Sequence, residues 1–270
     1  MAADKLETIR APDSTSHIEV RNISIGYGSF VVMKDINFAV GRKEIFIIMG
    51  GSGSGKSTLL RTLLGLLEPA AGEVLYNGES FTRADPDQRL RMLRRFGVTY
   101  QSGALWSSMT LAENVALPLS EYTNLSPAEI REVASLKLAM VGLKGFEDFY
   151  PAQISGGMQK RAGLARAIAL DPEVLFFDEP SAGLDPITSR RLDDLILELR
   201  DSLGSTVMVV THELASIFAI GDDSVLLDGE SRTPIAYGNP RQLRDHSADP
   251  RVRSFLTRGE PPAGSVQDRG

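Results

Sequence analysis

A glycine-rich stretch, MGGSGSGKST at Met49–Thr58, has the residue types and spacing that bind phosphate. It contains the pattern Gly-x-x-x-x-Gly-Lys-Ser from Gly50 to Ser57. Glycines let backbone N–H groups surround phosphate oxygens, the lysine reaches the β- and γ-phosphates of a nucleotide, and the serine hydroxyl ligates Mg2+. The predicted ATP-binding residues of this loop are Gly50, Gly51, Ser52, Gly53, Ser54, Gly55, Lys56, Ser57 and Thr58.

A second candidate group is an acidic pair at the end of the apolar run VLFFDEP, residues 174–180. Asp178 is predicted to hold Mg2+ through a coordinated water, which gives the metal a second protein anchor beside Ser57. Glu179 lies one residue further on and is the better candidate to polarise the attacking water. The alternative is a solvated acidic turn.

The elements around these residues must hold them at one edge of a sheet. The apolar run EIFIIM before the glycines reads as a strand buried on both faces, and KSTLLRTLLGLLEP after them reads as a helix that stops at Glu68-Pro69. A buried strand, a glycine loop and a helix are the context that the phosphate-binding pattern requires.

Strands and helices alternate along the rest of the chain, which predicts a parallel sheet with crossovers. Residues 17–40 read as two or three short strands, and residues 102–169 as mainly helical, with a capping box from Ser126 to Glu129. The other expected strands are GEVLYNGE, FGVTYQ, EVLFFDE and STVMVVTH, and the other helices are DPDQRLRMLRR and PITSRRLDDLILELRDSL.

Composition excludes several classes of function. The 270 residues include 29 Lys plus Arg and 35 Asp plus Glu, a net charge of -6 that argues against non-specific nucleic-acid binding. There is no cysteine, so disulfide and thiol chemistry are excluded. We find no apolar run of about 18 residues and no secretory signal, and therefore expect a soluble or peripheral, cytoplasmic protein.

One further segment gives the chain a family resemblance. ISGGMQKR, residues 154–161, resembles the signature loop of ABC-type ATPases, and the family's remaining motifs follow in the family's order over about residues 17–237. The matched positions are Tyr27 for the aromatic that stacks on adenine, Gln101 for the Q-loop glutamine, Asp185 for the D-loop, and His212 for the switch histidine. Taken alone, each has a structural reading: a half-buried strand tyrosine, a polar strand end, an N-cap aspartate, a structural histidine.

The resemblance implies an α/β fold: a P-loop NTPase (RecA-like) parallel-sheet core, an N-terminal antiparallel β subdomain and an inserted α-helical subdomain. It implies an ATPase with ATP and Mg2+ as ligands, working as a head-to-tail homodimer. Ser155, Gly156 and Gly157 would then meet the γ-phosphate bound by the other subunit. His212 would contact the γ-phosphate and orient Glu179, and Gln101 would contribute to the Mg2+ site.

The expected domains follow from these assignments. Residues 1–16 would be a flexible N-terminus and 17–237 the ATPase cassette, with its helical subdomain at about 102–169. Residues 238–258 would form a C-terminal helical extension, and 259–270 a disordered tail. In the extension, DPRVRSFL is expected to pack as a short helix through Val252, Phe255 and Leu256, on its own chain or on a neighbour.

A narrower resemblance concerns the ATPases of Mce-linked lipid transporters, including the Mla (maintenance of lipid asymmetry) system of Gram-negative bacteria. It rests on YQSGALWSSMTLAENVALPL, on SGGM in place of the commoner SGGQ, and on DPRVRSFL. It implies phospholipid transport at the cytoplasmic face of the inner membrane, with a membrane permease, an Mce-domain lipid-binding protein and a small STAS-type subunit as partners. Met158 and Ile154 depart from the commoner signature residues, but neither is assigned to nucleotide chemistry.

Three alternatives stay open at this point. The chain could serve import of a polar solute or export of a drug. It could be a soluble ABC ATPase acting on DNA or ribosomes, although it carries one copy of each motif and no long heptad segment. A P-loop kinase or GTPase would lack the SGGM loop and the switch histidine. The segment after Gln101, SGALWSSMTLAENVALPL, holds Leu105, Trp106, Met109 and Leu111 and is expected to form either the permease groove or interlobe packing.

Overall fold

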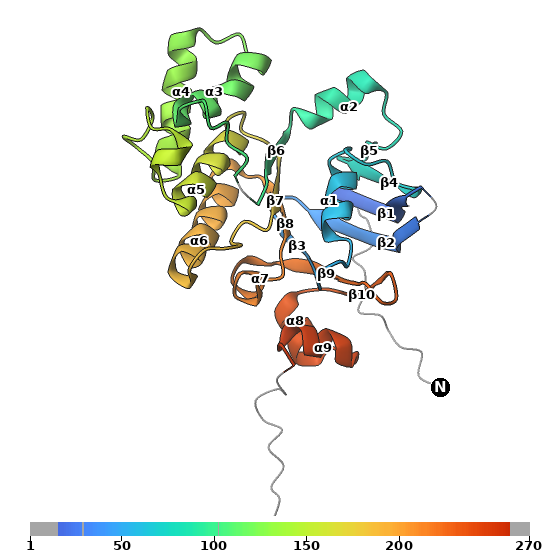
Figure 1. Cartoon of the computed structure of the whole chain (residues 1–270). Coiled ribbons are helices and arrows are strands. Elements are labelled where there is room, and N and C mark those ends of the chain that lie inside the picture. The colour runs from blue at the N-terminus through green and yellow to red at the C-terminus, as the bar shows by residue number, and fades with distance from the viewer. Residues whose placement is uncertain (1–15, 29, 102, 260–270) are drawn as a thin grey trace, which may run out of the picture.

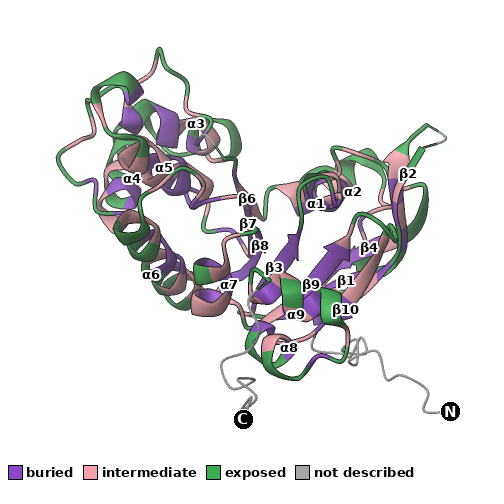
Figure 2. Ribbon diagram, turned by 60° about the horizontal axis from the view of Figure 1, so that its bottom comes forward, coloured by how far each residue is buried: buried purple, intermediate pink, exposed green. Residues whose placement is uncertain are grey.

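The computed structural model describes residues 16–28, 30–101 and 103–259 (Figure 1). Residues 1–15 and 260–270 lie outside the described residues. The predictions of a flexible N-terminus and a disordered C-terminal tail fall almost entirely on them. Two sheets and a group of helices make up the described part. The antiparallel sheet and the inserted helices lie on opposite sides of the central strands (Figure 2).

The N-terminal sheet has four antiparallel strands in the order β2-β1-β4-β5. Its strands are β1 Ser16–Tyr27, β2 Phe30–Gly41, β4 Ala71–Tyr76 and β5 Glu79–Ser80. The region read as two or three short strands is therefore two strands of twelve residues each. GEVLYNGE, predicted as one strand, is instead a hairpin. Asn77 and Gly78 both have positive φ, 52° and 77°, which is the geometry of a tight two-residue turn.

The second sheet has six strands in the order β10-β9-β3-β8-β7-β6, all parallel except β10. They are β3 Ile45–Gly50, β6 Phe96–Thr99, β7 Val174–Asp178, β8 Thr206–Val210, β9 Asp223–Asp228 and β10 Thr233–Tyr237. Every residue of β3 is buried, as its continuous apolar run predicts. Successive residues of β3 enter different cores: Ile45 and Ile47 face the core that includes the inserted helices, and Phe46 and Ile48 face the N-terminal sheet.

Helices connect these strands and form the inserted lobe between β6 and β7. They are α1 Lys56–Leu63, α2 Pro86–Leu93, α3 Leu111–Tyr122, α4 Pro127–Met140, the short 3-10 helix Pro151–Gln153, α5 Gly156–Ala167, α6 Pro186–Leu203 and α7 Leu214–Ile220. The capping box predicted at Ser126 and Glu129 is confirmed. The helix predicted to reach Glu68-Pro69 is wrong at its end: α1 stops at Leu63, because Gly65 takes a left-handed φ of 69° against the ring of Phe81.

Two short helices, α8 Pro240–His246 and α9 Pro250–Leu256, follow the last strand and lie at the bottom of Figure 1. In α9 the side chains of Val252 and Leu256 are buried in the main core, which is the core that Ile45, Ile47 and the inserted helices share, and Phe255 packs against it. The segment expected to pack on its own chain or on a neighbour therefore packs on its own. Across the described residues, we find no helix with the length and apolar character needed to span a membrane.

Candidate nucleotide-binding and catalytic site

The loop from Gly50 to Gly55 turns the chain from β3 into α1 in the way phosphate binding requires. A Cβ at Gly50 would lie 2.6 Å from the backbone oxygen of Leu227, so the loop is pressed against the neighbouring strand. Gly55, the N-cap of α1, has a left-handed φ of 92° that other residues rarely adopt. The positive end of α1 thus begins directly at the glycine loop.

Lys56 is the charged group of this loop, and it is only 8% exposed. Its Nζ donates hydrogen bonds of 2.9 Å to the carbonyl oxygens of Gly50 and Gly51. Burial lowers the pKa of Lys56, while the carboxylates of Glu179 and Asp178 act in the opposite direction. The ammonium group is therefore held at the loop by backbone oxygens, with two acids close enough to influence it.

The two acids stand at the carboxyl end of β7. Burial raises the pKa of Asp178, and the charge of Glu179 adds to this, whereas Arg61 and Lys56 oppose it. Asp178 Oδ1 is buried and has no hydrogen-bond partner among the described residues. A buried carboxylate oxygen without a partner fits a cation ligand, since Mg2+ binds through one or two protein groups together with phosphates.

The chemistry of the donors agrees with Mg2+ as well. Asp178 and the hydroxyl of Ser57 are hard oxygen donors, and they would hold the ion. Within the described ranges there is no group of three or more His, Cys, Asp or Glu side chains able to hold a metal by themselves. Two protein oxygens match the way Mg2+ binds beside the phosphates of a nucleotide, through one or two protein groups.

Glu179 and His212 form the most direct catalytic arrangement in the described chain. Glu179 Oε1 lies 2.8 Å from His212 Nδ1. Glu179 has a left-handed φ of 49°, a strained conformation for a residue with a side chain, and its backbone N–H donates to the carbonyl of Val210 at 2.8 Å. The other carboxylate oxygen, Oε2, is buried without a hydrogen-bond partner in the described part of the chain. One oxygen is thus oriented by a histidine and one is free to accept a proton.

Several of the predicted residues line one cleft of about 660 Å³. Those shared with the prediction are Gly50, Gly51, Ser52, Gly53, Lys56, Ser57, Gln101, Glu179 and His212. They come from the ends of different strands, so the parallel sheet brings together residues that are far apart in the sequence. Gln101 follows β6 and is exposed. Tyr27 ends β1, is 49% exposed and is not among the residues lining this cleft.

The signature residues lie elsewhere. Ser155 is the N-cap of α5 and accepts a hydrogen bond of 3.3 Å from the backbone N–H of Met158. Ser155 and Gly157 line a different cleft, formed by the end of α4 together with α5 and α6, and Gly156 is exposed. Asp185 caps α6 by accepting from the N–H groups of Ile187 and Thr188. Within a single chain, the structure therefore does not bring the signature loop to the glycine loop.

Sequence reasoning missed some residues that support the site. Lys160 of α5 donates to the carbonyl oxygens of Pro180 and Ala182 at 2.7 and 2.5 Å, so it ties the signature helix to the loop after Glu179. Asp193 of α6 accepts a hydrogen bond from Ser216 of α7 at 3.0 Å. Lys160 lies inside the signature segment, which could have drawn attention to it. Nothing in the sequence pairs Asp193 with Ser216.

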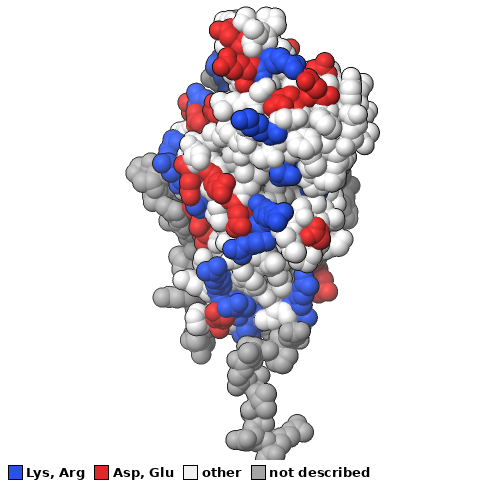
Figure 3. Space-filling model, turned by 90° about the vertical axis from the view of Figure 1, so that its left-hand side faces the viewer, with Lys and Arg blue, Asp and Glu red and all other residues white. Residues whose placement is uncertain are grey.

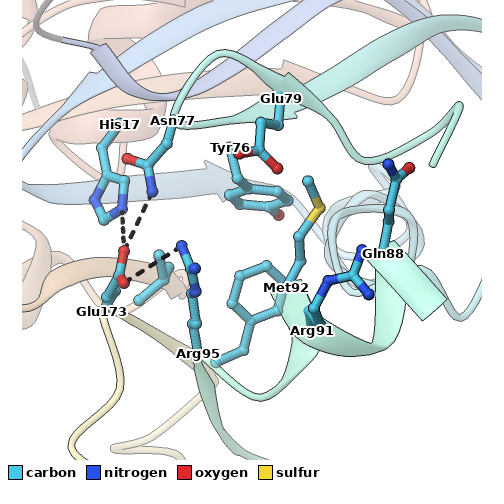
Figure 4. Close-up of a pocket in the computed structure, with 11 residues that line it drawn as sticks. His17, Tyr76, Asn77, Glu79, Gln88, Arg91, Met92, Arg95 and Glu173 are labelled. Atoms are coloured by element: carbon cyan, nitrogen blue, oxygen red, sulfur yellow. Dashed lines mark hydrogen bonds and ion pairs between the residues drawn. The ribbon is translucent and has the colours of Figure 1, made fainter.

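A second cavity of about 270 Å³ lies away from the glycine loop (Figure 4). Four of its polar side chains contact one another: Glu173 is 3.6 Å from both His17 and Arg95 and accepts a hydrogen bond from Asn77 at 3.2 Å. Burial lowers the pKa of His17, whose Nδ1 lies 2.7 Å from the Thr206 hydroxyl. These contacts join the N-terminal sheet to the parallel sheet, and we assign this cavity a structural role.

Comparison with known proteins agrees with this geometry. A family model described as ABC transporter matches residues 33–182. The chain is 39% identical over 239 residues to the intermembrane phospholipid transport system ATP-binding protein MlaF of Escherichia coli (strain K12), covering 88% of each chain. It is 38% identical over 239 residues to the probable ribonucleotide transport ATP-binding protein mkl of Mycobacterium tuberculosis, covering 88% of this chain and 66% of mkl.

Two solved structures are similar as well. The dimeric ATP-binding cassette MJ0796 in a post-hydrolysis state, bound to ADP and Pi, has a TM-score of 0.73 at 31% identity, over 82% of this chain and 97% of that one. CbiO1 from Clostridium perfringens, part of the ABC transporter complex cbiONQ, has a TM-score of 0.77 at 25% identity, over 90% and 99%. The predicted fold class is confirmed, and the chain belongs to the ABC transporter family, in which it is an ATP-hydrolysing cassette.

Proposed function

We propose that this chain is the ATPase subunit of a membrane transporter for phospholipids, and that it works as a head-to-tail homodimer beside a separate permease. One observation carries the catalytic part of the proposal: the 2.8 Å pair of Glu179 and His212 opens into the same cleft as Lys56 and Ser57. The lipid part is supported by the 39% identity with MlaF, which covers 88% of both chains.

The residues of the cleft have separate tasks in hydrolysis. The backbone of the glycine loop and Lys56 bind and orient the phosphates of ATP. Ser57 and Asp178 would hold Mg2+, which would supply positive charge to the β- and γ-phosphates. Glu179 polarises the attacking water and accepts its proton on a carboxylate oxygen, while His212 holds Glu179 in position. Gln101, two residues after β6, lines the same cleft and would contribute to the Mg2+ site.

The separation of the signature loop from the glycine loop supports the dimer. Ser155, Gly156 and Gly157 begin α5 with free space around the first glycine and an exposed N-terminus. A helix start of this kind suits a phosphate bound by a second copy of the chain. ATP is then enclosed between two subunits, and hydrolysis opens the pair, a motion that can drive a partner. MJ0796, the similar cassette, is described as a dimer.

The permease groove is assigned to the segment after Gln101. Trp106 is 61% exposed, although its backbone is fixed: its N–H donates to Asn114 Oδ1 at 2.7 Å, and Asn114 is completely buried. Leu111 is buried and belongs to the core. Of the four apolar residues predicted for the groove, only Leu105, Trp106 and Met109 therefore remain for docking. An exposed tryptophan on a rigid backbone suits the anchor position for an amphipathic coupling helix.

The remaining partners and the location complete the proposal. An Mce-domain lipid-binding protein and a small STAS-type subunit would join the permease, and the chain would sit at the cytoplasmic face of the inner membrane. These partners and this location are what the resemblance of the sequence to the ATPases of Mce-linked lipid transporters implies; the name of MlaF supports only the phospholipid substrate. The similarity to mkl favours a second candidate, an ATPase for transport of a polar solute such as a ribonucleotide, but the chain spans only 66% of mkl's length.

A nucleic-acid function has less support. Figure 3 shows a face of the molecule on which acidic and basic side chains are interspersed. A phosphate backbone requires instead a continuous basic strip, which this face does not present.

The test is Glu179→Gln in the full-length chain. The amide keeps the shape of the side chain but cannot accept the proton, so we expect ATP affinity to persist and turnover to fall by about 10²-fold or more. ATP should then hold the dimer closed, which size-exclusion chromatography or crosslinking detects. Glu230→Gln, on the exposed turn after β9, is the matched control. Turnover at the wild-type rate in Glu179→Gln would refute the assignment.

A separate experiment tests the substrate. Stimulation of the ATPase rate by phospholipid rather than by ribonucleotide, measured in the assembled transporter, separates the two candidate functions.

A further inference from the structure

The C-terminal helix α9 reaches the catalytic cleft of its own chain. Ser254, Phe255 and Arg258 line the same cleft as Lys56 and Glu179. The helix is anchored there because Val252 and Leu256 are 0% and 1% exposed within the main core. Ser254, Phe255 and Arg258 thus lie beside the proposed site of hydrolysis, although they follow Gly55 by 199, 200 and 203 residues.

A continuous series of polar contacts runs from this helix end to the proposed general base. Arg258 Nη2 lies 3.5 Å from Glu213 Oε2, and Glu213 Oε1 lies 3.7 Å from His212 Nε2. The other ring nitrogen of His212 is the one that meets Glu179 at 2.8 Å. Glu213 is the N-cap residue of α7, but its side chain makes no capping hydrogen bond. The carboxylate of Glu213 instead lies between the guanidinium of Arg258 and the imidazole of His212.

We propose that Arg258 is a positioning residue for ATP hydrolysis, acting through Glu213 on His212. The inference rests on the proposed function of the cleft. His212 is 54% exposed on a loop, so little packing restricts rotation of its ring. A carboxylate on each side of the ring restricts that rotation and keeps Nδ1 on Glu179. Arg258 keeps Glu213 in place, and the C-terminal extension thereby becomes part of the catalytic geometry.

The expected effect is modest, because the contacts are exposed and longer than direct hydrogen bonds. Loss of Arg258 should lower kcat about threefold to fivefold and leave the KM for ATP unchanged, since the side chain orients the base without binding nucleotide. A fivefold fall corresponds to about 1 kcal/mol, at 1.36 kcal/mol for each factor of ten.

The experiment measures steady-state ATP hydrolysis by the full-length chain over a range of ATP concentrations. The variants are Arg258→Ala, Arg258→Lys and the control Arg251→Ala, each made with Glu213 and with Glu213→Gln. Arg251 is a matched control because it is an exposed arginine of α9, the helix that ends just before Arg258, and it pairs with Asp228 and Asp249 instead. We expect a lower kcat for Arg258→Ala, partial rescue by Arg258→Lys, no change for Arg251→Ala, and no further effect of Arg258→Ala once Glu213 is Gln.

Each other outcome overturns the proposal in a recognisable way. A raised KM that persists with Glu213→Gln would make Arg258 a nucleotide-binding residue. An equal loss of kcat and of thermal stability in Arg258→Ala and Arg251→Ala would reduce both to structural contacts. An unchanged kcat in Arg258→Ala would remove the role altogether. Absence of hydrolysis in the wild-type chain would count against the proposed function itself, and it is measured first.

Discussion

The buried carboxyl group of Asp193 allows a quantitative prediction of how the free energy of unfolding depends on pH. Asp193 is 2% exposed and joins α6 to α7 through Ser216, and these two helices begin after the proposed site residues Asp185 and His212. Burial raises the pKa of Asp193 from 3.8 to about 6, and the hydrogen bond from Ser216 and the charge of Arg190 oppose this. Its Oδ1 has no hydrogen-bond partner within the described ranges.

The free energy of unfolding should therefore depend on pH in a definite direction. The folded state binds the proton of Asp193 more tightly than the unfolded state does. This contribution to stability is fully present below pH 3.8 and is lost as the pH rises through about 6. The difference between the two pKa values corresponds to about 3 kcal/mol, at 1.36 kcal/mol for each factor of ten. Above pH 7 the ionised Asp193 thus lowers stability by up to that amount.

Asp193→Asn removes the charge and can still accept the hydrogen bond from Ser216. At pH 7.5 we expect the variant to be more stable than the wild type by about 1–3 kcal/mol, because its amide still lacks a partner on one side. This corresponds to a rise in Tm of roughly 2–8 °C for a chain of this size. The advantage should shrink as the pH falls from 7.5 to 5.

The assay is thermal unfolding followed by circular dichroism at pH 5.0 and 7.5. Asp201→Asn is the matched control: Asp201 lies on the same helix, is exposed, and has its pKa lowered by the hydrogen bond from Arg200. A variant Asp193→Asn that is less stable than the wild type at pH 7.5 would show that the charge of Asp193 is needed in the fold. A gain that is equal at both pH values would show that the pKa is not raised.

Three further predictions concern the loop, the exposed tryptophan and the C-terminal helix. Lys56→Ala should abolish ATP binding or turnover and leave Tm within about 1 °C, because the Nζ of Lys56 contacts carbonyl oxygens of the loop. Isothermal titration with ATP and an ATPase assay measure this, and a normal ATPase rate in the variant would contradict it. Trp106→Glu should fold and bind ATP but lose co-purification with the permease and permease-stimulated turnover, and a variant that assembles fully would place the groove elsewhere. Leu256→Ala should lower the free energy of unfolding by about 2–4 kcal/mol, measured in urea against the exposed control Ser254→Ala, and an equal effect of both would mean that α9 does not pack as described.

Local patterns explain which parts of the fold could be predicted from the sequence. The capping box at Ser126 and the whole of α6 depend on residues a few positions apart, and both were found where the pattern placed them. The hairpin after β4 also had a local signal, the dipeptide Asn77-Gly78, which the strand prediction overlooked. The early end of α1 had no comparable local signal, since Gly65 turns there against Phe81, a residue of another segment.

The same distinction applies to the site. Strand order in a parallel sheet brings the ends of β3, β6, β7 and β8 to one edge, so motif residues at those ends could be assigned to one cleft. The contacts that support them could not. The pairs Lys160–Ala182, Asp193–Ser216 and Arg258–Glu213 join segments whose spacing obeys no local rule. They depend on how helices pack, which the amino-acid pattern of any one helix does not specify.

The buried polar atoms that lack a partner also distinguish this site from the rest of the fold. Of six such side-chain atoms in the described chain, three belong to Ser54, Asp178 and Glu179. Each unsatisfied buried group costs folding about 1–3 kcal/mol, so a chain selected for stability alone would pair them. These three lie at the glycine loop and at the end of β7, where the proposed site would supply phosphate, metal and water as partners. The second cavity shows the opposite pattern, since Glu173 is satisfied by three neighbours there. The unpartnered oxygens of Ser54, Asp178 and Glu179 are therefore consistent with a ligand site at the glycine loop, whereas the contacts of Glu173 are consistent with a structural role.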